Sequence, residues 1–176
     1  MPTITLSATI HAPISRCFDL ARSIDFHTHS MRGTGERAIA GRTSGLIAEG
    51  EEVTWQARHF GLVQRLTSRV SVCRPPQVFI DEQVRGPFRS FRHEHRFEPL
   101  DERATRLTDI FTYRAPLGPL GRIAEAAFVT GTMRRLLQRH QEHLKAALES
   151  EEWRRFLPGE PLRIPPSGPP DASAPG

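Results

Sequence analysis

The sequence lacks several features that would assign a protein to a functional class at once. Only two cysteines occur, Cys17 and Cys73, and neither has the spacing of a zinc site or a redox motif. No apolar run approaches the length of about 18 residues that spans a membrane, and the N-terminus shows no signal-peptide pattern. These absences predict a cytoplasmic protein with reduced thiols and no transmembrane segment.

Motifs of the common enzyme classes are also missing. The sequence contains no nucleophile elbow, phosphate-binding loop, zinc signature or dinucleotide fingerprint. It therefore predicts no cofactor and no metal. Acid–base chemistry is not excluded, because groups that only transfer protons need no sequence motif.

Lysine is almost absent, although the protein carries a net charge of +4. Lys145 is the only lysine among 24 basic residues, so nearly all of them are arginine. The arginines are scattered over outward strand positions, are matched by 20 acidic residues, and form no concentrated basic helix. We therefore expect no nucleic-acid partner.

The residues that are present predict one domain followed by a tail. A length of 176 residues and a hydrophobic content of 38% are typical of a single globular domain. From Pro158 onward the chain is rich in proline and has no aromatic residue, so it cannot bury enough apolar surface to order itself. We predict a domain over residues 1–150 and a disordered tail over residues 151–176.

The order of the predicted elements indicates an α+β fold. Residues 3–10 alternate as a half-buried strand does, and Pro13 suits the first turn of a helix. A second short helix is predicted over residues 24–31, strands fill residues 36–114, and a long amphipathic helix then runs to about Ser150. About seven antiparallel strands curved around a long C-terminal helix form a helix-grip fold with a cavity between sheet and helix.

Two neighbouring predicted strands carry the most informative pattern. His93 and His95 share a strand face with aromatic residues, and Asp109 shares a face with aromatic residues in the next strand. Two imidazoles and a carboxylate among aromatic rings indicate a pocket with polar groups in its wall. A register that places His95 opposite Asp109 brings both inner faces together, and it requires an odd-length loop or a bulge near residues 101–104.

A second register is predicted for the reversal at residues 86–87. If these two residues form the whole loop, Glu82 lies opposite Phe91, and Ile80 lies opposite His93. Glu82 then points inward, where an acid requires a partner such as a histidine or an arginine. His27 and His29 are predicted to be exposed loop residues between the short helices.

The roles of His93, His95 and Asp109 remain open between three interpretations. They can form an internal hydrogen-bond network, orient a ligand's carbonyl or phenol, or move protons in a cyclisation or dehydration. Two histidines and a carboxylate can also hold zinc or non-haem iron. Histidines two positions apart lie about 7 Å apart along a strand, which disfavours such a metal site.

The predicted cavity is lined by the inner faces of the strands and by the last helix. In the simplest interpretation these side chains are only core. The residues predicted to contact a ligand are Trp55, Val70, Ile80, Glu82, Phe91, His93, His95, Phe97, Asp109, Phe111, Tyr113, Met133 and Leu137.

A set of motifs is spread over residues 3–148. They are Ala12-Pro13 ahead of Phe18-Asp19, Val53-Thr54-Trp55, Phe79-Ile80-Asp81-Glu82-Gln83, Gly86-Pro87-Phe88, His93-Glu94-His95-Arg96-Phe97, Asp109 with Tyr113, and Pro116-Leu117-Gly118-Pro119-Leu120-Gly121. Together they resemble the SRPBCC (START / Bet v 1-like / polyketide cyclase) superfamily, and within it the bacterial cyclase/dehydrase-like branch. The resemblance implies a cavity for a hydrophobic or aromatic small molecule or lipid, but no particular reaction.

The sequence therefore favours a protein that binds a hydrophobic small molecule or lipid. One alternative is an aromatase/cyclase-like dehydratase that uses His93, His95 and Asp109 for proton transfer. Another is a module that binds a protein or a membrane and has no ligand. Monomer and homodimer are both compatible with the sequence.

Overall fold

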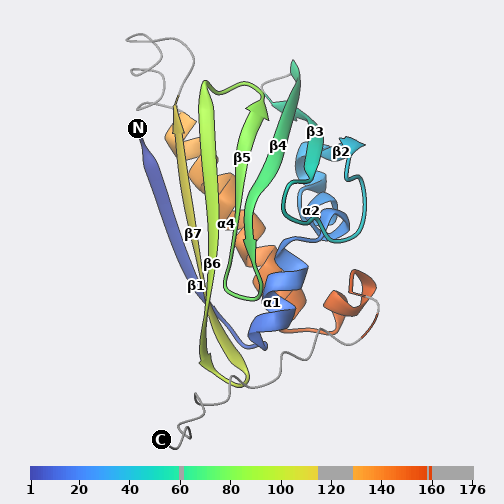
Figure 1. The fold of residues 1–176 in the computed structure, drawn as a ribbon, viewed down its shortest axis with the longest axis vertical. Coiled ribbons are helices and arrows are strands. Elements are labelled where there is room, and N and C mark those ends of the chain that lie inside the picture. The colour runs from blue at the N-terminus through green and yellow to red at the C-terminus, as the bar shows by residue number, and fades with distance from the viewer. Residues whose placement is uncertain (60–61, 115–128, 158, 160–176) are drawn as a thin grey trace, which may run out of the picture.

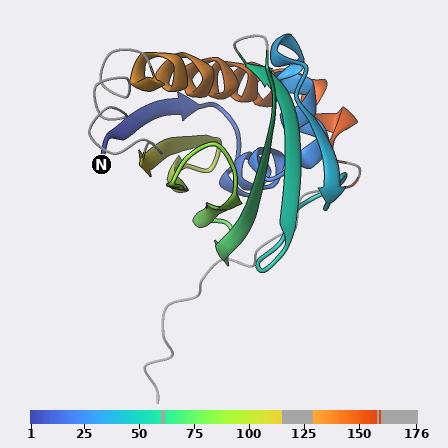
Figure 2. The ribbon, with the colours of Figure 1, turned by 90° about the horizontal axis from the view of Figure 1, so that it is seen from above.

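The computed structural model describes residues 1–59, 62–114, 129–157 and 159. A seven-stranded antiparallel sheet curves around the long helix α4 (Thr130–Leu148), as Figures 1 and 2 show. The strand order is β1-β7-β6-β5-β4-β3-β2. The strands are β1 (Thr3–Ile10), β2 (Arg37–Gly41), β3 (Glu52–His59), β4 (Leu62–Arg74), β5 (Val78–Arg85), β6 (Ser90–Asp101) and β7 (Ala104–Arg114). The predicted helix-grip fold is confirmed.

Two short helices follow the first strand, as predicted. Pro13 directly precedes α1 (Ile14–Ala21), where its missing N–H leaves no hydrogen bond unmade. Helix α2 (Ile24–Ser30) begins at a side-chain cap, because the Ser23 hydroxyl accepts a hydrogen bond from the backbone N–H of Phe26. A 3₁₀ turn, η1 (Arg32–Thr34), leads from α2 toward β2.

The last helix ends where the sequence predicts, but the packed domain continues beyond it. A 3₁₀ turn, η3 (Glu152–Arg155), follows α4 and brings Trp153 and Leu157 into the main core. Trp153 is only 5% exposed, and the Arg16 guanidinium lies 4.0 Å from its ring. Packed residues therefore continue past residue 150, where the sequence predicts the domain to end. The predicted loop at 115–121, the start of the long helix at 121–128 and the tail from 158 lie outside the described residues, apart from residue 159.

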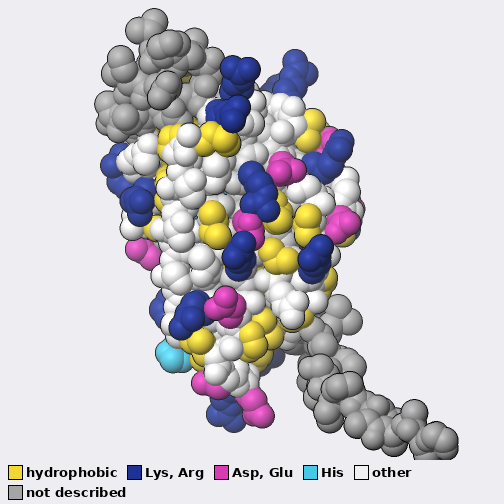
Figure 3. Space-filling model, turned by 60° about the vertical axis from the view of Figure 1, so that its left-hand side comes forward, with side chains coloured by type: hydrophobic (Ala, Val, Ile, Leu, Met, Phe, Trp, Pro, Cys, Tyr) yellow, Lys and Arg dark blue, Asp and Glu magenta, His cyan; other side chains and the backbone are white. Residues whose placement is uncertain are grey.

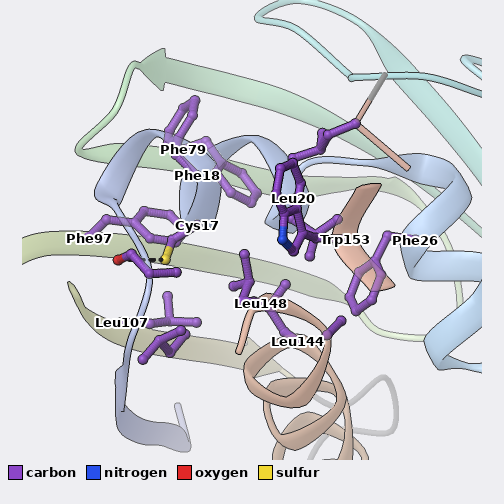
Figure 4. Packing of buried hydrophobic residues seen from close by; sticks show 14 residues of the cluster. Cys17, Phe18, Leu20, Phe26, Phe79, Phe97, Leu107, Leu144, Leu148 and Trp153 are labelled. Atoms are coloured by element: carbon purple, nitrogen blue, oxygen red, sulfur yellow. Dashed lines mark hydrogen bonds between the residues drawn. The ribbon is translucent and has the colours of Figure 1, made fainter. Parts of the chain in front are cut away.

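The main core closes one end of the space between the sheet and α4. Figure 4 shows Phe18 of α1 facing Phe79 and Phe97 of the sheet, with edge-to-face ring separations of 5.7 and 5.5 Å. Leu144 and Leu148 of α4 lie on the other side of this cluster. This end is filled with side chains, so any cavity must lie farther along α4.

The register between β6 and β7 is as predicted. His95 pairs with Asp109, and the pairing shifts by one residue between Pro99 and Asp101, near the turn. This irregularity is the bulge that the alternation pattern requires. It places His93, His95 and Asp109 on the inner face of the sheet.

The predicted register between β5 and β6 is wrong by one residue. The loop includes more than residues 86–87, because β5 ends at Arg85 and β6 begins at Ser90. A one-residue shift exchanges the two faces of a strand. Phe79 and Asp81 consequently point inward, and Glu82 lies on the outer face, 3.8 Å from Arg92. The observed pairs are Ile80 with Glu94, Asp81 with His93, and Glu82 with Arg92.

Charges of both signs cover the outer face of the sheet. Arg92 and Arg96 both bond the carboxylate of Glu94 along β6. Figure 3 shows basic, acidic and apolar side chains intermingled on the side drawn there. In the described part of the chain, no helix has both the length and the apolarity that a membrane crossing requires.

Candidate functional site

A largely apolar cavity of about 380 Å³ lies between the sheet, α2 and α4. Strands β3 and β4 line one side of it, β5, β6 and β7 line another, and α4 lies across both. The predicted residues that line it are Trp55, Val70, Phe91, His93, His95, Phe111, Met133 and Leu137. The prediction that sheet and C-terminal helix enclose a hollow is therefore confirmed.

Five predicted contact residues lie elsewhere. Ile80 and Glu82 are on the outer face because of the register shift described above. Phe97 packs in the main core. Tyr113 is fully buried, and its hydroxyl lies 2.7 Å from the hydroxyl of Thr130 on α4. Asp109 is not part of the cavity wall but lies directly behind it.

Asp109 is the centre of a buried polar cluster. Its Oδ1 atom lies 2.7 Å from His95 Nδ1 and 3.5 Å from His93 Nε2. Its Oδ2 atom accepts a hydrogen bond of 2.6 Å from the side-chain amide of Gln141 on α4. The carboxylate thus ties the two central strands β6 and β7 to the helix.

Asp81 completes the cluster on its cavity side, and the sequence prediction missed it. Asp81 Oδ1 lies 3.4 Å from His95 Nε2 and 3.9 Å from His93 Nδ1. The ring centroids of His93 and His95 are only 3.9 Å apart, so the side chains converge. The spacing of about 7 Å along a strand that argued against a metal therefore does not hold for the rings. Asp81 was assigned to the wrong face only because the loop length was wrong.

The environment of each cluster member sets its charge. Burial alone would lower the pKa of His95, but Asp109 and Asp81 outweigh it and raise this pKa to about 9. Burial and the neighbouring His95 lower the pKa of His93. Burial would raise the pKa of Asp109, but the two histidines hold it well below its usual range. At neutral pH the cluster contains a carboxylate–imidazolium pair beside a neutral imidazole.

A second histidine pair lies across the cavity, on the helices. His27 of α2 lines the cavity, with its ring 4.4 Å from that of Trp55 and its Nε2 3.2 Å from Glu36. His140 of α4 also lines it, and its Nδ1 lies 2.8 Å from the Ser30 hydroxyl. The prediction of an exposed loop is wrong for His27.

His29 also lies on a helix rather than in a loop. It is part of α2, is half-buried and pairs with Glu152 at 2.9 Å, so the loop prediction is wrong for it as well.

The sequence did contain a signal for His140. Met133, Leu137 and His140 follow the spacing of one helix face, so a prediction made from that face should have included the histidine.

The half-buried His140 makes stability depend on pH. Burial, reinforced by His27, holds the pKa of His140 well below 6.5, with smaller influences from Asp109, His95 and His93. Below pH 6.5 the unfolded chain takes up a proton that the folded chain refuses, so folding is weakened as pH falls. We expect wild type to lose stability relative to His140→Asn between pH 6.5 and 5, by at most about 1.4 kcal/mol per pH unit.

Urea unfolding of both proteins at several pH values measures this difference. Asparagine is chosen because its amide can still bond the Ser30 hydroxyl but does not titrate. The difference should be constant above pH 7.5. A difference that is constant down to pH 5 would contradict a neutral His140 in the folded protein.

Comparison with known proteins agrees with this architecture. The family model described as "Polyketide cyclase / dehydrase and lipid transport" matches residues 1–149. The chain belongs to this family. A search of curated proteins found no match to this sequence.

Solved structures similar to this family member share its fold at low sequence identity. The Thermus thermophilus protein TTHA0849 has 17% identity and a TM-score of 0.68, over 84% of this chain and 97% of that one. The Panax ginseng major latex-like protein 151 has 12% identity and a TM-score of 0.60, over 85% and 98%. The ZhuI aromatase/cyclase of Streptomyces sp. R1128 has 19% identity and a TM-score of 0.55, over 89% and 96%.

Proposed function

We propose that the protein binds a hydrophobic or aromatic small molecule, or a lipid, that carries at least one oxygen function. The supporting observation is the composition of the cavity wall. Most of the wall is apolar, and Asp81, His93 and His95 converge as a polar cluster on its sheet side, opposite His27 and His140 on the helices. A mainly apolar hollow with a few convergent polar groups is the usual form of a small-molecule site.

The volume of the cavity sets the size of the ligand. About 380 Å³ lies near the lower end of the range for small-molecule sites, about 300–1,000 Å³. A bicyclic or tricyclic aromatic compound, or a short acyl chain, fits such a volume. Its apolar body would contact Trp55, Val70 and Leu137, and its oxygen would face the imidazoles.

Fluorescence titration with 1-naphthol and 1-methylnaphthalene tests this proposal. The two probes have similar size and differ in one hydroxyl. We expect both to bind wild type with one site per chain, and 1-naphthol to bind about 2–12-fold more tightly, as one additional hydrogen bond predicts. In His93→Leu the preference should vanish while the binding of 1-methylnaphthalene remains.

A cavity-filling variant supplies the control for the location of the site. Leu137→Trp adds volume to the α4 side of the cavity and should weaken both probes at least tenfold, whereas Leu137→Met conserves volume and should not. Absence of probe binding by wild type would overturn the proposal. Equal binding by Leu137→Trp would also overturn it, because the probes would then bind elsewhere.

A second candidate function is dehydration or cyclisation by acid–base chemistry. The observation that favours it is the pairing of a neutral and a protonated imidazole at the cavity wall, since one group can accept a proton while the other donates one. Loss of water from an added β-hydroxyketone, dependent on His95, would distinguish this reaction from binding alone. An interaction module without a ligand has less support, because a module of that kind needs no hollow of this size.

A further inference from the structure

The side chains of Asp81, His93 and His95 have the arrangement of a three-ligand metal site. One ligand atom from each residue lies within 4.8 Å of the other two. We propose that these residues bind a divalent transition-metal ion of the Zn²⁺ or Fe²⁺ class in the wall of the cavity. The sequence argued against any metal, so this site arises from the structure alone.

The distances suit a four-coordinate ion. Ligand atoms that each lie about 2.0–2.2 Å from such an ion are about 3.3–3.6 Å apart. Asp81 Oδ1 is 3.4 Å from His95 Nε2 and 3.9 Å from His93 Nδ1. All three ligand atoms lie within 4.8 Å of one another, so rotations of the Asp81 and histidine side chains would draw them in around an ion.

Asp109 lies behind the two imidazoles, nearer to His95 than to His93. Each ring presents one nitrogen to Asp81 and the other to Asp109, at 2.7 Å for His95 Nδ1 and 3.5 Å for His93 Nε2. A carboxylate behind a ligating histidine fixes the ring and makes it a stronger ligand. Gln141 in turn anchors Asp109 through a 2.6 Å hydrogen bond from its amide.

Charge and position favour the same ion. Asp81 and Asp109 together offer two carboxylates, which match the two positive charges of the ion, and His95 releases its extra proton to solvent when the ion binds. Two imidazoles and one carboxylate are a ligand set suited to Zn²⁺ and Fe²⁺, whereas Ca²⁺ and Mg²⁺ prefer oxygen ligands alone. The three ligands line the cavity and Asp109 does not, so the open coordination position would face the cavity.

This placement adds a specific contact for a ligand. Three protein ligands leave at least one position for water or for an oxygen atom of a bound molecule. A carbonyl, phenolate or enolate oxygen at the polar end of the cavity would lie within reach of that position. The metal proposal does not depend on such a ligand, because binding of the ion can be measured alone.

Titration of the chelator-treated, untagged full chain with Co²⁺ tests the site. Four- or five-coordinate Co²⁺ absorbs visible light strongly, whereas hydrated Co²⁺ does not. We expect one ion per chain, displaced by Zn²⁺. Asp81→Ala and His95→Gln should weaken binding of Co²⁺ by more than about 100-fold. Asp109 contacts the imidazoles but would not contact the ion, so Asp109→Asn should weaken binding by about 10–100-fold.

His29→Gln is the matched control, because His29 also pairs with a carboxylate but lies outside the cavity wall. It should bind Co²⁺ as wild type does. Zn²⁺ should also raise the unfolding temperature of wild type and of His29→Gln but not of Asp81→Ala, which gives a second readout. Far-ultraviolet circular dichroism checks that each variant folds.

Three results would overturn the proposal. The first is wild type that binds no Co²⁺. The second is Asp81→Ala that binds as tightly as wild type, which would place the ion elsewhere. The third is equal weakening by His29→Gln and Asp81→Ala, which would indicate adventitious binding by surface histidines. None of these results bears on the binding of 1-methylnaphthalene, so the two proposals can fail separately.

Discussion

Replacing Asp109 with alanine should lower the free energy of unfolding by about 3–5 kcal/mol, because it leaves the buried His95 charge with only the more distant Asp81 as a partner. Asp109 is 5% exposed and contacts both His93 and His95. Its removal also leaves the amide of Gln141 without an acceptor. Urea unfolding at pH 7, with the metal chelated, measures this loss.

Two comparisons separate the charge from the packing. Asp109→Asn keeps the volume and one acceptor oxygen, so it should cost less than Asp109→Ala. Glu98→Ala removes an exposed acid that pairs with Arg106 at 3.6 Å, and should change stability by no more than about 0.5 kcal/mol. A loss below about 1 kcal/mol for Asp109→Ala would show that the cluster does not depend on this carboxylate.

Trp153→Ala should have a similarly large effect, about 3–5 kcal/mol, although Trp153 lies beyond the domain boundary that the sequence predicts. The indole ring packs in the main core with Leu144 and Leu148, and Arg16 stacks against it. Its removal leaves a void and exposes the last turn of α4. Thermal and urea unfolding of the variant measure the effect.

A truncated chain provides the control for this result. A stop after Leu157 removes most of the segment predicted to be a disordered tail and should leave the midpoint of unfolding unchanged. A stop after Ser150 should match or exceed the loss in Trp153→Ala. If the chain ending at Ser150 were as stable as the full chain, the contacts of Trp153 would not contribute to the fold.

Much of the fold could be predicted because its strands alternate strictly. β1, β3 and β7 each show a two-residue period, and the pairing of His95 with Asp109 followed from matching the inner faces. The alternation at β5 was ambiguous, since Ile80 is apolar but lies on the outer face and Asp81 is charged but lies on the inner one. Because a carboxylate, Asp81, lies on the inner face, the hydrophobic pattern predicted the wrong register between β5 and β6.

Other parts of the site could not be found from local pattern. Trp153 falls in the segment predicted from the sequence to be a disordered tail, and its contacts with α1 and α4 bury it. His27 was predicted to be an exposed loop residue. In the structure the ring of Trp55, from a strand far away in the sequence, packs against it. Both cases depend on contacts between segments far apart in the sequence, which periodicity does not reveal.

The strand order has a consequence for how ligand preference could change. The imidazoles and acids lie on β5, β6 and β7, each with a hydrogen-bonded neighbour on both sides, whereas β2 forms a sheet edge with an irregular register near Ala38. Interior strands resist distortion more than edges do. Substitutions of apolar wall residues such as Trp55 and Leu137 should therefore change the shape of the cavity while the strands that carry Asp81, His93 and His95 retain their geometry. If the cavity binds a ligand as proposed, such substitutions would change the preferred ligand without altering the polar cluster.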